Sequence, residues 1–175
     1  HMGKKEDTHA RIVEHAAKAL RASGYDGVSV ADIMKEAGLT HGGFYAHFES
    51  RDALVVEALE QATRGSIASL DDAKDLATIA ERYLSDAHVK KPELGCALAA
   101  LGSETRRQPA AVRKIASKNV AGFKKRLKAA GLGEEEALVA LSALVGALVL
   151  GRAVDDSKTS KDLRDAVRRF VAKTK

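Results

Sequence analysis

The chain has 175 residues, of which 45% are hydrophobic and 30% are charged, a composition that excludes a disordered or fibrous protein. The single cysteine, Cys96, excludes an internal disulfide and is typical of a reducing compartment, so we expect a cytoplasmic protein. The most apolar run, residues 137–151, is shorter than the roughly 18–20 residues that span a bilayer, so we expect no membrane partner.

The formal net charge of +5 is unevenly distributed along the chain. Residues 1–65 contain 8 Lys and Arg against 10 Asp and Glu, a net charge of −2, and residues 66–175 contain 21 against 14, a net charge of +7. Because bulk charge steers association without locating a site, a nucleic-acid site has to be argued from the sequence pattern.

Helix-starting and helix-ending residues divide the chain into about nine helical segments, and no stretch alternates like a β-strand. The first predicted helix covers about residues 7–23. Ser29 begins a short second helix, with Asp32 three residues later as in a capping box, and Gly38 ends it. Thr40 is the expected N-cap of a third helix.

The predicted helices lengthen in the second half of the chain, after a fourth helix that begins at Ser50. Pro92 interrupts the chain before a helix expected at about 93–107, and Pro109 begins the next helix. Ser160 is assigned as the N-cap of the last helix. The predicted fold class is all-α.

The segment between Ser29 and Phe48 has the pattern of a helix-turn-helix, two short helices joined by a tight turn that contains glycine. Gly38 can adopt a positive φ, which lets the chain reverse. Phe44 and Phe48 are four residues apart, share one helix face and are predicted to be buried. The residues left available to a DNA groove are His41, Gly42, Tyr45 and His47.

This part of the chain resembles the DNA-binding domain of the TetR/AcrR family of bacterial regulators. The resemblance rests on GYD at 24–26, SVADI at 29–33 and AGLTHGGFYAHFESRDAL at 37–54, and it covers about the first 60 residues. Downstream, the number and length of the predicted helices agree with the family. The resemblance implies a homodimer that binds double-stranded operator DNA, with a C-terminal helical domain that binds a small-molecule inducer.

The resemblance also assigns DNA contacts before and at the start of the third helix. Ser29 resembles the hydroxyl residue that contacts phosphate, and Thr40, His41 and Gly42 resemble the start of the recognition helix. Position 41 is often lysine in the family, whereas histidine is mostly neutral at pH 7. With Gly43 following Gly42, few side chains remain to read bases, so we expect specificity to depend on backbone approach and DNA shape.

Three further residues resemble phosphate contacts of the family. Tyr45 and His47 resemble the aromatic contacts of the recognition helix, and Arg51 resembles the basic contact at the start of the fourth helix. Each has a structural alternative from the sequence alone: Tyr45 as a surface aromatic and His47 as a side chain packed on the helix below.

Residues 137–151 are hydrophobic nearly all round, so a helix formed by them must be covered on every side. A second subunit and the chain's own core are the two possible coverings. We expect a dimer interface built from this helix and the last one, as the resemblance also implies. The residues assigned to this interface are Leu141, Leu144, Leu148 and Phe170.

The candidate lining residues of a ligand cavity are Tyr83, Cys96, Ser103 and Phe123. Cys96 lies in the expected first turn of its helix and close to two lysines, and it has two interpretations: a small buried hydrophobe, or a redox or electrophile sensor. No histidine pair has the i, i+4 spacing of a helical metal site, and no phosphate-cradling glycine loop or nucleophile elbow occurs, so we expect no metal, cofactor or enzymatic activity.

We therefore predict a transcriptional repressor that releases its operator when a small molecule binds the C-terminal domain. Its predicted parts are a helix-turn-helix domain at 1–50, a connecting helix at 51–65 and a ligand-binding and dimerisation domain at 66–175. Two alternatives remain open: a helical protein-interaction module without sequence-specific DNA binding, and a thiol-based sensing regulator that uses Cys96.

Overall fold

The computed structural model describes residues 3–174, and within them the chain forms nine α-helices, two 3₁₀ helices and no strand. The prediction of an all-α fold is confirmed. The elements are α1 (Lys4–Ser23), α2 (Val30–Glu36), η1 (His41–Ala46), α3 (Arg51–Ala68), α4 (Leu76–Tyr83), α5 (Asp86–Lys90), η2 (Pro92–Leu94), α6 (Ala97–Thr105), α7 (Ala110–Ala129), α8 (Glu134–Ala153) and α9 (Ser157–Lys173).

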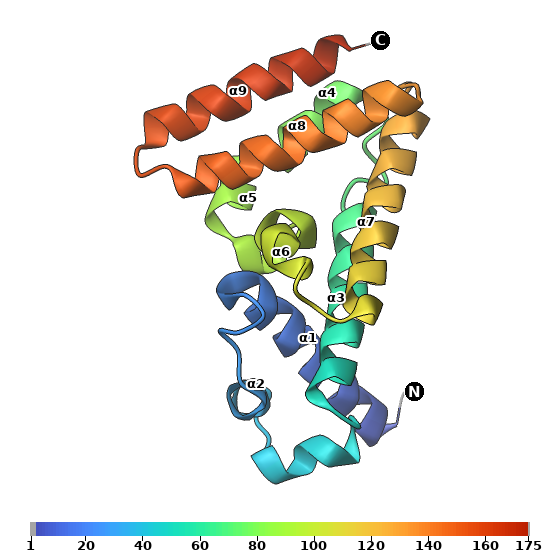
Figure 1. The fold of residues 1–175 in the computed structure, drawn as a ribbon, viewed down its shortest axis with the longest axis vertical. Helices are drawn as coiled ribbons and strands as arrows, with labels where there is room; N and C mark the ends of the chain where they lie inside the picture. The colour runs from blue at the N-terminus through green and yellow to red at the C-terminus, as the bar shows by residue number, and fades with distance from the viewer. Residues whose placement is uncertain (1–2, 175) are drawn as a thin grey trace.

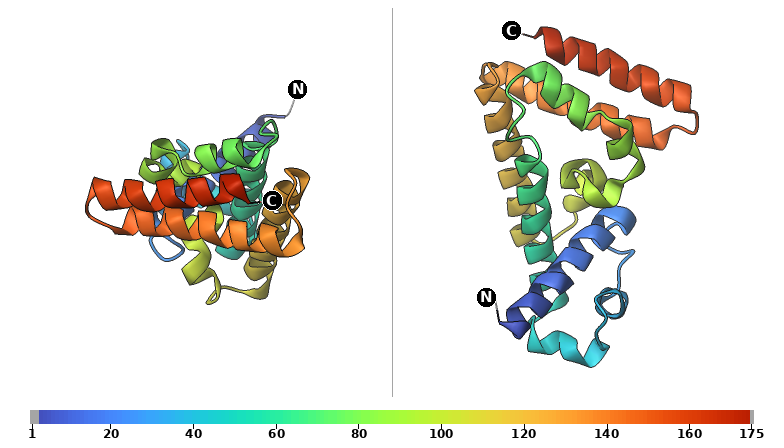
Figure 2. Two further views of the ribbon diagram at one scale, coloured as in Figure 1. Left: turned by 90° about the horizontal axis from the view of Figure 1, so that it is seen from above. Right: turned by 180° about the vertical axis from the view of Figure 1, so that it is seen from behind.

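The molecule is elongated, with its N-terminal helices at one end and α8 and α9 side by side at the other (Figure 1). Helix α3 leads away from the N-terminal end and packs against both α1 and α7. From behind and from above, α4 is seen to lie against α8 and α9 (Figure 2). The short helices α5, η2 and α6 fill the middle, where the two ends of the molecule meet.

Two clusters of buried side chains form the core. The first gathers residues of α1, α2, η1 and α3, together with Ala97 and Leu101 of α6 and Val112 and Ile115 of α7. The second is built from α4, α7, α8 and α9. The N-terminal end therefore shares its core with α6 and α7.

Two predicted helix starts are wrong. Helix α6 begins at Ala97, because the residues after Pro92 form the 3₁₀ helix η2 and Cys96 has extended backbone (φ −65°, ψ 123°) as the N-cap. Helix α9 begins before Ser160, because the Asp156 carboxylate already accepts a hydrogen bond from the Thr159 N–H at 2.7 Å. Ser160 is a buried residue inside α9.

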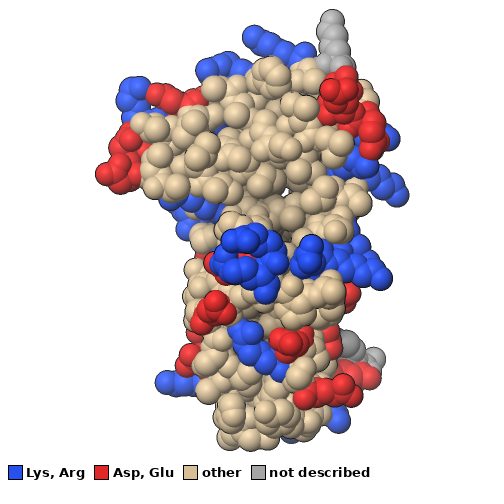
Figure 3. All heavy atoms as spheres, viewed as in Figure 1, with Lys and Arg blue, Asp and Glu red and all other residues tan. Residues whose placement is uncertain are grey.

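The three leucines assigned to a partner interface lie in the chain's own core. Leu141, Leu144 and Leu148 are 8%, 0% and 0% exposed, because their face of α8 packs on the second core cluster. The large apolar side chains that α8 and α9 leave exposed are Leu138, Val139, Val149 and Leu150 of α8 and Phe170 of α9. Figure 3 shows few charges over this end of the molecule, with lysines, arginines and carboxylates at its rim. Among the helices of residues 3–174, α8 alone is long and apolar enough to cross a membrane.

Candidate functional site

The turn between α2 and η1 fixes where the candidate DNA-reading residues point. Gly38 has a φ of +75°, which L side chains rarely adopt, so the predicted reversal at this glycine is confirmed. The Leu39 N–H donates to the Met34 carbonyl at 2.8 Å and the Gly38 N–H to the Lys35 carbonyl at 3.0 Å. These paired bonds form a Schellman motif, which ends α2 and starts the chain toward η1.

Two phenylalanines anchor η1 to the N-terminal core. Phe44 and Phe48 are 1% and 4% exposed with ring centroids 5.5 Å apart, which confirms that they are buried. The ring of His9 on α1 stacks on Phe48 at 4.3 Å, and its Nε2 lies 2.6 Å from Oε2 of Glu57 on α3. The η1 segment is thus held between α1 and α3, through a histidine that the sequence pattern did not single out.

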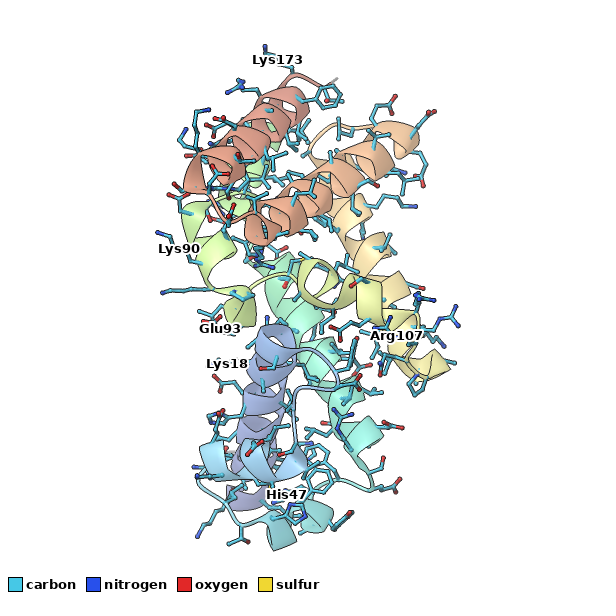
Figure 4. All side chains as sticks on the ribbon, turned by 60° about the vertical axis from the view of Figure 1, so that its left-hand side comes forward. Lys18, His47, Lys90, Glu93, Arg107 and Lys173 are labelled. Atoms are coloured by element: carbon cyan, nitrogen blue, oxygen red, sulfur yellow. The ribbon has the colours of Figure 1, made fainter. Side chains whose placement is uncertain are left out.

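The opposite side of η1 faces solvent. Thr40, His41, Gly42 and Tyr45 are exposed, Tyr45 to 73%. The segment is a six-residue 3₁₀ helix rather than the predicted α-helix, which agrees with the low helix propensity of its two adjacent glycines. Figure 4 shows this end of the molecule at the level of His47, opposite the end marked by Lys173.

His47 has one nitrogen turned inward and one left for a partner. Its Nδ1 is buried and has no hydrogen-bond partner among the described residues. Burial, followed by the nearby charges of His9 and Lys5, lowers the pKa of His47. The neutral ring can therefore keep Nδ1 unprotonated and offer Nε2–H as a donor.

The other two assigned phosphate contacts already make bonds within the chain. The Ser29 hydroxyl accepts from the Asp32 N–H at 3.0 Å and donates to its carboxylate at 2.6 Å, which caps α2. Arg51 is half-buried, and its Nη2 donates to the carbonyls of Tyr25 and, at 3.3 Å, Val28. Arg51 therefore ties α3 to the α1–α2 connection, a role that no local sequence signal indicates.

A cavity of about 290 Å³ lies in the middle of the molecule, between α3, α4, α5 and the segment before α6. Tyr83 and Cys96 contribute to its wall, and they also border a smaller hollow lined by Phe123 and Asn119. The rings of Tyr83 and Phe123 lie 5.2 Å apart. The structure thus brings together three of the four predicted lining residues, whereas Ser103 is exposed on α6 and lines neither hollow.

Burial dominates the chemistry of two groups in this wall. The Tyr83 hydroxyl is buried and has no hydrogen-bond partner within the described residues, and burial beside the Cys96 thiol raises the pKa of Tyr83 well above its usual range. Cys96 is 3% exposed, so a reagent has to enter the cavity before it can reach the sulfur.

The peptide group between Gly95 and Cys96 connects this cavity to the N-terminal end. Its N–H donates to Nε2 of His88 at 3.0 Å, and Nδ1 of His88 in turn bonds the Tyr83 carbonyl at 2.5 Å. Since one ring nitrogen accepts and the other donates, His88 is neutral with its proton on Nδ1, and burial lowers its pKa.

The carbonyl of the same peptide group faces the other way. It accepts from Nη1 of Arg21 on α1 at 2.8 Å and from the Ser66 hydroxyl on α3 at 3.2 Å. A Cβ atom at Gly95 would lie 2.4 Å from the His88 ring, so only glycine fits without displacing the ring. Sequence reasoning missed His88 and Arg21, because their importance depends on contacts between segments far apart in the chain.

Comparison with known proteins gives matches of two kinds. Residues 12–58 match the family described as bacterial regulatory proteins, tetR family. The uncharacterized HTH-type transcriptional regulator YwcC of Bacillus subtilis is 38% identical over 58 residues, which are 33% of this chain and 26% of that relative. The matched segment thus spans about a quarter of the relative's length.

The similarity of fold extends over nearly the whole chain. A TetR transcriptional regulator from Chloroflexus aurantiacus superposes with a TM-score of 0.81 at 21% identity, covering 99% of this chain and 98% of that one. The regulator FadR from Bacillus subtilis, solved in complex with stearoyl-CoA, superposes with a TM-score of 0.70 at 14% identity over 94% and 97% of the two chains. The helices beyond residue 58 therefore have the fold of these regulators as well.

Proposed function

Since residues 12–58 match the family of bacterial regulatory proteins, tetR family, we propose that the chain is a ligand-responsive repressor that binds operator DNA as a homodimer. The observation that carries the proposal is the η1 segment, which is anchored by Phe44 and Phe48 and exposes its other side at one end of the molecule. A regulator of this kind acts in the cytoplasm and needs no cofactor.

The exposed side of η1 enters a major groove in this proposal. The hydroxyl of Tyr45 and Nε2–H of His47 donate to phosphates, and His41 is the side chain that reaches a base edge. Gly42 and the backbone following Thr40 allow close approach of the chain to the DNA. Ser29 and Arg51 bind phosphate only by giving up part of their internal bonding, so we assign them smaller contributions.

A second copy of the chain covers the exposed apolar side chains of α8 and α9. Val139 and Leu150 are 51% and 52% exposed on α8, and Phe170 is 60% exposed on α9. A contiguous apolar surface of this kind marks an interaction site in a soluble protein. Pairing through α8 and α9 gives a dimer with two η1 segments, which then meet half-sites about 34–36 Å apart or at a multiple of that spacing.

A small molecule in the central cavity releases the DNA. A ligand that displaces α4 or α5 shifts His88, and the Gly95–Cys96 peptide passes the shift to Arg21 and so to α1. FadR, which shares the fold, was solved with stearoyl-CoA, and this supports ligand binding by a protein of this fold. Induction requires only that the ligand bind better to the dimer whose η1 segments no longer fit the half-sites.

The proposal is tested by selecting binding sequences from a pool of random DNA with the purified protein. We expect enrichment of an inverted repeat, bound in a gel-shift assay with an affinity that falls as salt rises. The Tyr45→Ala variant should bind the selected DNA about tenfold less tightly without unfolding, because the side chain is exposed. Lys125→Ala, exposed on α7, is the control.

Absence of an enriched sequence, together with salt-insensitive binding, would overturn the proposal. The same result would favour the alternative of a helical module that binds other proteins.

A further inference from the structure

The charged groups around the central cavity are all of one sign. Arg82 and Lys91 line the 290 Å³ cavity beside the neutral ring of His88, and Arg126 lines the smaller hollow that Tyr83 and Cys96 also border. No Asp or Glu of residues 3–174 lines either one. A hollow walled by one sign of charge and by apolar groups concentrates counter-ions.

The cationic side chains differ in whether they already have an ion-pair or hydrogen-bond partner within the chain. Arg82 pairs with the exposed Asp72 at 2.5 Å, and Arg126 donates to backbone carbonyls, at 2.9 Å to that of Leu70. Lys91 is exposed and forms no ion pair within the described part of the chain. Lys91 is therefore the cation at this cavity that can pair with a ligand.

The remainder of the wall is apolar and has one hydrophobic side chain at the surface. Leu70, Tyr83 and Cys96 are buried in the wall, whereas Leu94 is 58% exposed. Lys91 and Leu94 lie three residues apart in the turn that includes η2, so charged and apolar groups flank the cavity together. Glu93, in the same turn, lines neither hollow.

We propose that the inducer is a small amphipathic anion, whose apolar body lies against Leu70, Tyr83 and Leu94 and whose carboxylate or other anionic head pairs with Lys91. The inference rests on the proposed function, because it names the ligand of the same cavity. A cationic ligand of equal shape meets positive charge and finds no carboxylate here, and burial without a partner costs free energy. A neutral ligand gains the apolar contacts and lacks the ion pair.

The test uses three probes with the same eight-carbon chain and different charge: octanoate, octan-1-ol and octylammonium. Binding is measured by thermal shift and by competition against the selected DNA in a gel-shift assay. We expect octanoate to raise the melting temperature most, by mass action, and to release DNA at the lowest concentration. Octylammonium should be the weakest of the three.

Variants identify the cation that is responsible. An ion pair at an exposed lysine is worth up to about 1 kcal/mol, so Lys91→Gln should weaken octanoate binding about two- to fivefold. Lys91→Glu should reverse the order of octanoate and octylammonium. Lys90→Gln is the matched control, because Lys90 is the exposed last residue of α5, directly before Lys91, projects outward (Figure 4) and does not line the cavity.

The inference is overturned if octan-1-ol equals octanoate, if Lys90→Gln weakens octanoate binding as much as Lys91→Gln, or if none of the three probes binds. DNA binding by the ligand-free protein is measured in the same gel. Retained DNA binding without a response to octanoate contradicts the ligand class alone, whereas loss of DNA binding contradicts the proposed function.

Discussion

Arg21 and Gly95 are 74 positions apart in the chain, and Nη1 of Arg21 donates a hydrogen bond of 2.8 Å to the Gly95 carbonyl. The bond joins α1 of the N-terminal end to a peptide group whose other side faces the central cavity. The Ser66 hydroxyl shares the same carbonyl, so α1, α3 and the segment before α6 meet at one oxygen atom.

Replacing Arg21 with alanine removes this bond and a second bond to the Ala17 carbonyl at 2.9 Å. We expect the free energy of unfolding to fall by about 1–3 kcal/mol, because the Gly95 carbonyl loses its charged donor. Urea denaturation measures the change. Arg11→Ala, exposed on the same helix, should alter stability by less than about 0.5 kcal/mol. Equal losses in the two variants would contradict a specific role for Arg21.

Gly95→Ala should destabilise the protein by about 1–3 kcal/mol, because the added Cβ meets the His88 ring at 2.4 Å. Gly102→Ala is a matched control within α6, where an added Cβ meets nothing within 4 Å. That change should stabilise the protein by about 0.5–1 kcal/mol, because alanine favours helix. Thermal melts of both variants measure the opposite signs, and a neutral Gly95→Ala would contradict the close packing of His88.

Stability should fall as the pH is lowered from about 7 to 5. The folded-state pKa values of His47 and His88 lie below the ordinary value of about 6.5. At a pH between the folded-state pKa and the ordinary pKa, the unfolded chain binds more protons than the folded chain, so acid favours unfolding. The contribution of these histidines to stability is fully present above the ordinary pKa and is lost as the pH falls toward the folded-state pKa. Urea denaturation at several pH values should show a smaller loss for His88→Gln, whereas His41→Gln, exposed on η1, should keep the full loss. An unchanged pH profile in His88→Gln would contradict this origin.

Two tyrosines should respond oppositely to loss of the hydroxyl. The Tyr83 hydroxyl is buried without a partner in the described residues, so Tyr83→Phe should raise the free energy of unfolding by about 1 kcal/mol. The Tyr25 hydroxyl bonds the Thr105 hydroxyl at 3.1 Å, so Tyr25→Phe should lower it by about 1 kcal/mol. Chemical denaturation of both variants measures the difference, and a loss of stability in Tyr83→Phe would show that this hydroxyl has a partner in solution.

Local sequence rules predicted the helix-turn-helix well, because its geometry depends on short-range chemistry. Gly38 adopts the positive φ that the turn requires, and the spacing of Phe44 and Phe48 placed both rings in the core. The 3₁₀ form of η1 departs from the prediction at the two adjacent glycines, where helix propensity is weakest.

The sequence predicted less where packing between distant segments decides which side of a helix is buried. Residues 137–151 are apolar all round, so no periodicity separates the buried Leu144 from the exposed Leu150. Ser160 and Asp156 both satisfy the preference for an N-cap residue, and in the structure the Asp156 carboxylate caps α9. Ser103 had no local feature to separate it from true lining residues, and its exposure follows from how α6 packs.

Footprinting of the selected operator tests the central claim most directly. DNase protection by the purified protein should cover two half-sites in inverted orientation, with centres about 34–36 Å apart or at a multiple of that spacing. The Tyr45→Ala variant should lose protection at both half-sites together, since both subunits carry the change. Protection of a single site by a monomer, or an unaltered footprint with Tyr45→Ala, would contradict DNA recognition by the η1 segments of a dimer.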